Sequence, residues 1–566
     1  MTIDVLLRGG TVVDGTGAPG FQADVAITDG KISAIAPQIT DDATTVIDAS
    51  GFIVAPGFID IHTHHDAQLL WDPELTSSAR HGITTVIAGN CGFTVAPVKP
   101  GDQDYIIQLL ARVEGMPPEA LKEGLAWDWE SFTEYLKQLD GRLGVNYISQ
   151  IGHSTVRRYV MGDDAYERAA TPEEIETMAG LLRDAVAAGA SGFTTSTSPT
   201  HNDSFGRAVP SRFAEPEEFY ALAEAVKDSP RPMVGISPGT KFSGISPEER
   251  ELMIGMGQRA GAMVHWNPLM TAPGSDLHKK FMELSVEARA EGVRVVGVYN
   301  PGPAGPSRVD LKSGFLFDSL PRWREVLKLP IPERCQALAD PTVRQEMKDD
   351  LAASNNGRLS EVLRTIWTTL VVTSAPSEAN QKYVGRAVAD IAAEEGREPI
   401  DVMIDISVAD ELETVFMSER DEDSDAWAIE TLLELCHDED VVFGGSDAGA
   451  HLDFMANEPT PSRAFALRVR DQGLLSLEET VHGFTGALAD AFGITDRGTL
   501  AVGQAADVVV FDLDTIGAES PELVRDLPGD SERLVAAPTG IRATIVNGVI
   551  VNDQDTPTGA LSGKLL

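Results

Sequence analysis

A dense group of metal-binding residue types follows an apolar run near the start of the chain. Residues 62–66 read HTHHD, directly after VAPGFIDI. Because successive side chains of a strand point to opposite faces, His62 and His64 are expected on one face and His65 on the other. Two imidazoles one strand repeat apart can bind one metal ion, and the apolar FIDI run favours a buried strand end over an exposed edge. We therefore predict His62 and His64 as metal ligands.

Two residues further along the chain have side chains that suit the same metal. Cys91, in GNCG, ends a second apolar run, and Asp447, in GGSDAGAH, ends the last one. A free cysteine alone is usually a small buried hydrophobe, but a thiolate beside two histidines is a good zinc ligand at ~2.3 Å. An aspartate can bind the metal and accept a proton from its water, although it can also cap a helix. We predict both residues as ligands and Asp447 as the catalytic base.

A second set of polar residues lies near other strand ends, where a substrate could bind. His153 and His201 close or follow the third and fourth apolar runs, and their alternative role is to hydrogen-bond loop carbonyls. Four cationic residues could bind a substrate carboxylate, or simply be solvated at the surface: Arg157, Arg158, Arg212 and Lys241. From this set we predict four substrate-binding residues, namely His153, His201, Arg157 and Arg212.

The elements that must position these residues form a repeating pattern. Eight apolar runs, each followed by a polar loop and a helical pattern, are typical of a (β/α)8 TIM-like barrel. The runs are FIDIHTHHD, GITTVIAGN, GVNYISQIGH, ASGFTTSTS, PMVGISPG, AMVHWNPL, RVVGVYNPG and VVFGGSDAG. Thr171 with Glu174, and Ser246 with Glu249, have the spacing of helix caps. Chemistry in such barrels occurs at the C-terminal strand ends, which is where the polar candidates lie.

The two ends of the chain have a different pattern. Residues 1–55 and 500–566 both contain short alternating strands with turn dipeptides such as DG and NG. We predict that these segments together form a small β-sandwich beside a barrel of residues 56–499. About 140 residues separate the seventh apolar run from the eighth, which is too many for a simple crossover. The excess, at residues 305–435, is predicted to be a helical insertion that could cover the barrel mouth.

The composition narrows the classes of partner. The 566 residues carry a formal net charge of −42, with a sequence pI of about 4.5. Such an acidic excess disfavours binding to nucleic acid phosphates or to an anionic membrane. Three widely spaced cysteines give no disulfide framework, and no stretch approaches the ~20 apolar residues of a membrane span. We expect a cytoplasmic protein that acts on a small molecule, with no nucleic acid or membrane partner, and that could form a homo-oligomer.

Several stretches match motifs of a known enzyme family. They are APGFIDIHTH, HGITTVIAGNCGFTVAP, GHSTVRRYVMG, GASGFTTSTSPTH, GGSDAGAH and the tail TDRGTLAVGQAADVVVFD with IVNGVIV. With these motifs the chain resembles the amidohydrolase superfamily, and within it the N-acyl-D-amino-acid deacylase (D-aminoacylase) group. The resemblance spans nearly the whole chain and implies a metal-binding barrel with a terminal β-sandwich. It also implies that His62 and His64 are the first-strand metal pair, Cys91 the thiolate ligand and Asp447 the eighth-strand aspartate, and that Tyr299 contacts substrate.

Two departures from the family pattern bear on the number of metals. Members of the group usually end the fifth strand with a metal-binding histidine before an arginine, and the sixth with a histidine after a serine. Here these ends read GISPGT and VHWNPL, with Ser237 and Pro238 in the neighbourhood of the first histidine. His265 is a candidate for the second, unless Trp266 aligns with that position. We therefore predict one tightly bound zinc ion, held by some of His62, His64, Cys91, His265 and Asp447.

The predicted function is metal-dependent hydrolysis of the amide bond of an N-acyl amino acid, with N-acyl-D-amino acids as the expected substrates. The same fold also supports hydrolysis of cyclic amides or imides, and deamination. The lysine that cyclic amidases often carboxylate near the fourth strand has no counterpart in GASGFTTSTSPTH, which weakens that alternative. An alternative of another class is a metal-free, non-catalytic assembly protein. Retention of His62, His64 and Asp447 counts against it.

Overall fold

Eight parallel strands run in chain order around a curled sheet in the computed structural model, which describes residues 2–271, 275–302, 305–312, 314–317, 319–355, 358–418 and 426–566. The strands are β6 (Phe58–Thr63), β7 (Ile83–Ala88), β8 (Asn146–Gly152), β9 (Gly192–Ser196), β10 (Met233–Ser237), β11 (Met263–Trp266), β12 (Val295–Tyr299) and β16 (Val441–Phe443). Each strand falls on one of the eight apolar runs, so this part of the prediction is confirmed.

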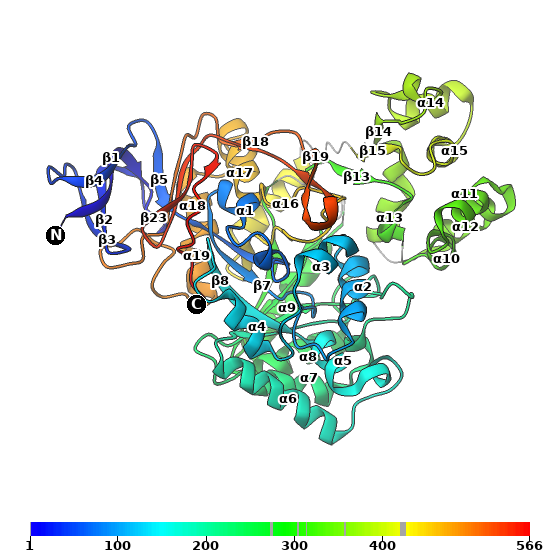
Figure 1. Cartoon of the computed structure of the whole chain (residues 1–566), viewed down its shortest axis with the longest axis horizontal. Coiled ribbons are helices and arrows are strands. Elements are labelled where there is room, and N and C mark those ends of the chain that lie inside the picture. The colour runs from blue at the N-terminus through cyan, green and yellow to red at the C-terminus, as the bar shows by residue number, and fades with distance from the viewer. Residues whose placement is uncertain are drawn as a thin grey trace.

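Helices connect the strands and surround the curled sheet (Figure 1). Thr171 and Ser246 each accept a hydrogen bond from the backbone N–H three residues on, so both predicted caps are confirmed. The helices outside the long insertion are α1 (Thr76–Arg80), α2 (Gln103–Val113), α3 (Pro118–Gly124), α4 (Phe132–Leu139), α5 (His153–Met161), α6 (Pro172–Ala187), α7 (Pro216–Ala225), α8 (Pro247–Ala260), α9 (Leu277–Ala290), α16 (Ala426–Cys436), α17 (Thr460–Ala464), α18 (Leu477–Phe484) and α19 (Gly486–Ala491).

Apolar side chains fill the amino-terminal side of the curled sheet. One cluster contains residues of β6, of β16 and of strands between them, together with Leu488, Phe492 and Leu566. Strands so far apart in the sheet order can share a cluster only on its inner face. The end of the chain lies beside β8, where Leu566 N donates to Tyr147 O at 3.0 Å. Polar side chains are left to occupy the opposite, carboxyl ends of the strands.

The two ends of the chain share one mixed nine-stranded sheet, with the order β24-β23-β22-β17-β5-β1-β2-β3 and β4 beside β1. Its strands are β1 (Ile3–Val12), β2 (Phe21–Thr28), β3 (Lys31–Ala36), β4 (Ala43–Asp48), β5 (Ile53–Pro56), β17 (Val508–Phe511), β22 (Ile541–Val546), β23 (Val549–Asp553) and β24 (Thr556–Pro557). The predicted pairing of the two ends is confirmed, whereas a two-layer sandwich is not. Two-stranded pairs lie nearby, β18 (Gly517–Ala518) with β21 (Pro538–Thr539) and β19 (Glu522–Leu527) with β20 (Ser531–Val535).

The terminal sheet is joined directly to the first strand of the curled sheet. Strand β5 leads through Gly57 into β6, and a side chain at Gly57 would meet Thr84 of β7 at 2.1 Å. Only glycine allows so close an approach of the two segments. The terminal sheet therefore helps to fix the strand that ends in HTHHD.

The residues between β12 and α16 contain helices and also a small sheet that the sequence analysis missed. Strands β13 (Ser307–Val309), β14 (Leu370–Ser374) and β15 (Val415–Ser418) pair in the order β13-β15-β14. The helices are α10 (Pro321–Leu327), α11 (Ile331–Ala339), α12 (Pro341–Ala353), α13 (Arg358–Thr365), α14 (Val388–Glu395) and α15 (Pro399–Ala409), and they stand to one side of the curled sheet (Figure 1). Residues 313, 318, 356–357 and 419–425 of the predicted insertion lie outside the described residues.

The insertion has a core of its own and touches the curled sheet's loops. The Trp323 indole stacks on Phe317, with ring centroids 4.5 Å apart, inside a separate apolar cluster. Arg324 and Lys328, near the end of α10, lie against Gly206 in the loop after β9. The insertion thus packs beside one strand-end loop.

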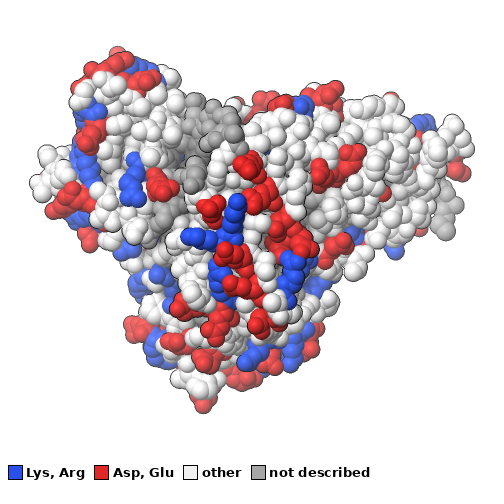
Figure 2. Space-filling view, turned by 180° about the vertical axis from the view of Figure 1, so that it is seen from behind, with Lys and Arg blue, Asp and Glu red and all other residues white. Residues whose placement is uncertain are grey.

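The surface carries charges of both signs. Figure 2 shows acidic side chains spread among basic ones over one face of the molecule. Within the described ranges, every helix is too short or too polar to cross a lipid bilayer.

A buried polar network joins the terminal sheet to β8. The Asp507 carboxylate, just before β17, accepts hydrogen bonds from Asn146 Nδ2 at 2.8 Å, from the Asn547 backbone N at 2.7 Å and from the Arg497 guanidinium. The side chains of Arg497 and Asp507 are each 3% exposed. This carboxylate therefore balances a buried cation at the junction of the two sheets.

We expect Asp507→Ala to lower the free energy of unfolding by about 3–5 kcal/mol, because it removes the buried partner of Arg497 and leaves this guanidinium with only the exposed carboxylate of Asp496 as a counter-charge. Chemical denaturation followed by circular dichroism measures this loss. Asp514→Ala, at an exposed position in the same segment, is the matched control and should stay within ~0.5 kcal/mol of the parent. A loss below ~1 kcal/mol for Asp507→Ala would show that the network does not hold the two sheets together.

Candidate metal centre

Backbone hydrogen bonds join the end of β6 to the residues that follow β16. Asp447 N donates to His62 O at 2.9 Å, and His64 N donates to Ala448 O at 2.7 Å. Between them, Thr63 and Ala448 form a parallel bridge. Because β6 and β16 are the two ends of the sheet order, these contacts bring the first and last strand ends together.

The junction places the Asp447 carboxylate against the histidine pair. Asp447 Oδ1 lies 3.4 Å from His62 Nε2 and 3.2 Å from His64 Nε2. The two histidine side chains are 3% and 1% exposed, whereas that of Asp447 is 34% exposed. Burial by itself raises the pKa of Asp447, but hydrogen bonds from both histidines outweigh it and hold this pKa well below its usual value. Asp447 is thus an ionised carboxylate on the open side of the pair.

Two of the candidate ligands occupy an uncommon backbone conformation. Asp447 has a φ of +67° and Cys91 a φ of +56°, in the left-handed region that few residues other than glycine adopt. The turn at Asp447 is held by Asp60, whose Oδ1 accepts a hydrogen bond from Ser446 N at 3.2 Å. Such conformations persist where surrounding contacts fix them, and they are concentrated at functional sites.

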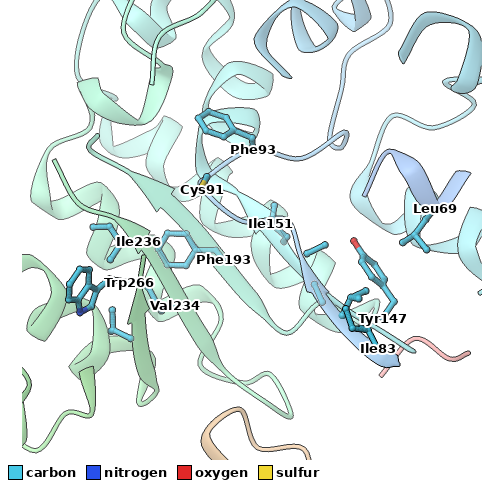
Figure 3. Close-up of a cluster of buried hydrophobic side chains, with 14 of the residues drawn as sticks. Leu69, Ile83, Cys91, Phe93, Tyr147, Ile151, Phe193, Val234, Ile236 and Trp266 are labelled. Carbon is cyan, nitrogen blue, oxygen red and sulfur yellow. The ribbon is translucent and has the colours of Figure 1, made fainter. Parts of the chain in front are cut away.

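Cys91 follows β7 and reaches the same cluster. Its Sγ lies 3.5 Å from His62 Nε2. Figure 3 shows Cys91 next to Phe93 among the buried apolar side chains of neighbouring strands. Burial by itself raises the pKa of the thiol, but the charge of His62, with hydrogen bonds from His62 and His64, lowers it to about 6. These contacts favour the thiolate, which is the form that binds metal.

His65 points away from the cluster, as predicted. Its Nε2 lies 2.9 Å from Ser78 Oγ and its Nδ1 lies 3.2 Å from Gln68 Oε1.

Glu114 joins the cluster from the long connection between β7 and β8, and no motif in the sequence marks it. It follows α2, its side chain is 3% exposed, and its Oε2 lies 3.4 Å from His64 Nε2. The Glu114 backbone oxygen accepts a hydrogen bond from His451 N at 2.5 Å, which fixes this connection against the loop after Asp447. The sequence offers one weak signal, an acidic residue directly before Gly115 at the end of a helical pattern.

The cluster contains the residue types of a metal site, and it includes a buried polar atom that has no hydrogen-bond partner. Ligand atoms of His62, His64 and Cys91 lie within 4.8 Å of one another, as do those of His64, Glu114 and Asp447. Within the described residues, Glu114 Oε1 is buried without a hydrogen-bond partner. Buried polar atoms are rarely left unsatisfied. Imidazole, thiolate and carboxylate are the ligands that zinc takes, so these residues fit a zinc ion.

The ends of β10 and β11 add no histidine to this cluster. His265, predicted as a possible ligand, lies outside both groups of ligand atoms, and its Nε2 is 3.3 Å from Gln150 Oε1. Its ring packs on Phe492, with centroids 5.4 Å apart, among the apolar side chains of the inner cluster. Trp266, the alternative at this position, packs on Phe281 of α9 at 4.9 Å.

Other polar groups occupy these two strand ends. Ser237 ends β10, and its Oγ accepts a hydrogen bond from Lys241 Nζ at 2.7 Å. Asn267, directly after β11, places its Nδ2 3.2 Å from His62 Nε2. Asn267 gave no recognisable signal in the sequence.

Two of the predicted substrate-binding residues lie together after β9. His201 Nδ1 is 2.7 Å from Ser196 Oγ, and Arg212 Nη1 donates to His201 O at 3.5 Å. Burial, followed by the charges of Lys241, His451 and His64, holds the pKa of His201 well below its usual value. The His201 ring packs on Phe93, two residues after Cys91, with ring centroids 5.4 Å apart, so His201 lies close to the metal-binding cluster. Tyr299, the other substrate-binding candidate from the resemblance, ends β12 and is half-buried.

His153 and Arg157 lie in a separate buried network. His153 Nε2 and Arg157 Nη1 each lie 2.8 Å from an oxygen of Glu218, and His153 Nδ1 lies 2.8 Å from Thr195 Oγ1. Because both side chains are buried and bonded to protein groups, the geometry gives them a structural role. Their contact with substrate stays a prediction.

Comparison with known proteins agrees with this arrangement. A model of the amidohydrolase family matches residues 45–552. The chain is 29% identical to D-aminoacylase of Alcaligenes xylosoxydans xylosoxydans, over 100% of this chain and 97% of that protein. It is 27% identical to the N-acyl-D-glutamate deacylase of the same organism, over 98% and 95% of the two chains.

A solved structure of D-aminoacylase has a similar fold. The two structures superpose with a TM-score of 0.66 and 26% identity, covering 99% of each chain. The binuclear metal centre of that D-aminoacylase is described as showing one-metal activation and second-metal attenuation. Since the family model spans most of its length, this chain belongs to the amidohydrolase family.

Proposed function

We propose that this protein is a zinc-dependent deacylase that hydrolyses the amide bond of N-acyl-D-amino acids to a carboxylate and a free amino acid. The observation that carries the proposal is the buried cluster of His62, His64, Cys91, Glu114 and Asp447 at the carboxyl ends of the parallel strands. The full-length similarity to D-aminoacylase and N-acyl-D-glutamate deacylase supports the choice of substrate. We further propose a TIM barrel of residues 56–499 beside a β-sandwich of residues 1–55 and 500–566.

The proposed metal content is one zinc ion. His62, His64, Cys91 and Asp447 would hold it, and Glu114 would supply a further carboxylate oxygen. The family's fifth-strand histidine is absent, and His265 lies outside the cluster, so the ligands of a second tight site are missing among the described residues. The one-metal activation described for the related D-aminoacylase is compatible with a single functional ion.

The side chains around this site have separate roles in the proposed reaction. When bound, zinc lowers the pKa of water from about 15.7 toward ~7 and polarises an amide carbonyl. Asp447, ionised and on the open side of the cluster, accepts a proton as water adds to the carbonyl carbon. It then donates this proton to the amide nitrogen as the C–N bond breaks. His451 Nε2 lies 3.6 Å from Asp447 Oδ2, on the side of the second carboxylate oxygen.

Substrate selection is assigned to the loops around the cluster. An N-acyl amino acid carries a carboxylate, which a chain of net charge −42 would otherwise repel. Arg212, beside His201 in the loop after β9, is the candidate to bind it. Tyr299 and His201 would line the same opening.

We expect Glu114→Gln to weaken zinc binding by ~10-fold or more, because the variant keeps the shape of the side chain but removes one anionic ligand. Competition with a chromophoric chelator measures this affinity. Glu119→Gln, at an exposed position on α3 in the same connection, removes an equal charge and should bind zinc like the parent. Equal affinities of the Glu114→Gln variant and the parent would exclude Glu114 from the ligand set.

A substrate screen tests the proposed reaction. We expect the zinc-loaded protein to hydrolyse N-acyl-D-amino acids in preference to their L-enantiomers, to cyclic imides and to amino-purines. Asp447→Asn, loaded with zinc and with its zinc content verified, should lose activity by ~100 to 10,000-fold or more, because an amide cannot accept the proton.

Asp490→Asn, at an exposed position on α19, is the control for the loss of one carboxylate and should remain active. Activity of zinc-loaded Asp447→Asn within a few-fold of the parent would contradict the proposed base. If the protein converted only cyclic imides or amino-purines, the proposed substrate class would be wrong.

A further inference from the structure

We propose that the ammonium of Lys241 is a second, fixed cation of this site, which stabilises the negative charge that develops on the amide oxygen of the substrate. The inference rests on the proposed amide hydrolysis. It adds to that proposal a role for the Lys241 ammonium, which lies at the end of β10. The family pattern has a metal-binding histidine at this strand end.

Lys241 belongs to the end of β10. The strand ends at Ser237, and Pro238 follows where the sequence departs from the family pattern. The chain then turns back, so that Lys241 Nζ donates to Ser237 Oγ at 2.7 Å. A cationic nitrogen thus lies at the strand end that lacks its histidine.

The loop that carries Lys241 is held rigidly. Glu249, at the start of α8, accepts hydrogen bonds from Gly239 N at 2.5 Å and from Thr240 N at 3.0 Å. Its Oε1 also accepts a hydrogen bond from Thr197 Oγ1, after β9, at 2.6 Å. Lys241 itself is 5% exposed, so its long side chain is ordered before substrate binds. Groups fixed in advance stabilise developing charge without reorganisation.

Most of the negative charges around Lys241 are those of the metal-binding cluster. Cys91, Asp447 and Glu114 act on it electrostatically, as does Glu249, the carboxylate that holds its loop. As ionised ligands these three groups carry three negative charges, of which a divalent ion balances two. A buried net charge is costly, so the third needs a cation, and Lys241 supplies it. The complete site of ligands, zinc and Lys241 is then close to neutral.

This position suits the reacting oxygen better than the substrate carboxylate. When the water oxygen bonds to the carbonyl carbon, the C=O π electrons move to the carbonyl oxygen, which becomes anionic. An ammonium has three N–H donors. Ser237 Oγ accepts one of them, so another is able to donate to this oxygen. The electrons return as the C–N bond breaks and Asp447 protonates the nitrogen. The substrate carboxylate is separated from the reacting carbonyl carbon by the amide nitrogen and the Cα atom.

Inorganic phosphate is a suitable probe, because it is a tetrahedral oxyanion that requires no turnover. We would load the parent, Lys241→Met and Lys241→Arg proteins with cobalt and titrate each with phosphate, following the visible cobalt spectrum. Lys241→Met should bind phosphate ~10-fold or more weakly, since it loses a charged hydrogen bond. Lys241→Arg keeps the charge and should retain most of the affinity.

Lys279→Met is the matched control, because it removes one lysine charge at a half-exposed position on α9, where Nζ lies 3.8 Å from Asp276. It should bind phosphate like the parent. Equal phosphate affinity in Lys241→Met and the parent would overturn the inference. Equal losses in the Met and Arg variants would also overturn it, because charge would then not be what matters.

Kinetic constants distinguish stabilisation of the oxyanion by Lys241 from binding of the substrate carboxylate. They also test the proposed amide hydrolysis separately from the role of Lys241. If Lys241 stabilises the oxyanion, Lys241→Met should lower kcat by ~100 to 1,000-fold with KM within a few-fold of the parent. A raised KM at unchanged kcat would make Lys241 a carboxylate clamp and overturn the inference. A parent protein that binds phosphate through Lys241 but hydrolyses no N-acyl amino acid would contradict the proposed function and leave the anion site standing.

Discussion

The pairing of the first and last strand ends is the constraint on which the site depends. Two backbone hydrogen bonds, Asp447 N to His62 O and His64 N to Ala448 O, join segments that lie almost the whole chain apart. They place the Asp447 carboxylate next to both imidazoles. The contacts that join the two strand ends therefore also assemble the site. The left-handed turn at Asp447 and the Asp60 contact with Ser446 serve this junction. The buried Asp507 network stabilises the opposite, terminal-sheet side of the molecule.

The polar groups at the fifth and sixth strand ends differ from those usual in the deacylase group. Members of the deacylase group resembled by this chain usually place histidines at the ends of the fifth and sixth strands. This chain places Lys241 and Asn267 there instead, and it adds the Glu114 carboxylate from another connection. An ammonium and an anionic carboxylate thus take part in this site, where the family pattern has neutral histidines at the strand ends.

Structural features that depend on local sequence patterns could be predicted from the sequence. Features that depend on the path of a long connection could not. All eight parallel strands coincide with apolar runs, and HTHHD, Cys91 and Asp447 stand at strand ends, where alternation and position suffice. His265 was harder to place, because the side of a strand that a single residue faces depends on how the sheet curls. Glu114 and Asn267 reach the cluster from loops, so no spacing rule finds them. The small sheet of β13, β14 and β15 pairs short, distant strands, which local propensity does not reveal.

We propose that one metal ion is bound by the side chains brought together at the β6 and β16 ends, and that none is bound at the ends of β10 and β11. Anomalous diffraction at the zinc edge, on crystals of the zinc-loaded protein, locates every bound zinc ion. We expect one peak, surrounded by His62, His64, Cys91 and Asp447, with a Glu114 oxygen at the ~2.0–2.2 Å of a zinc–carboxylate bond. A second peak of similar height beside Ser237 or His265 would contradict it.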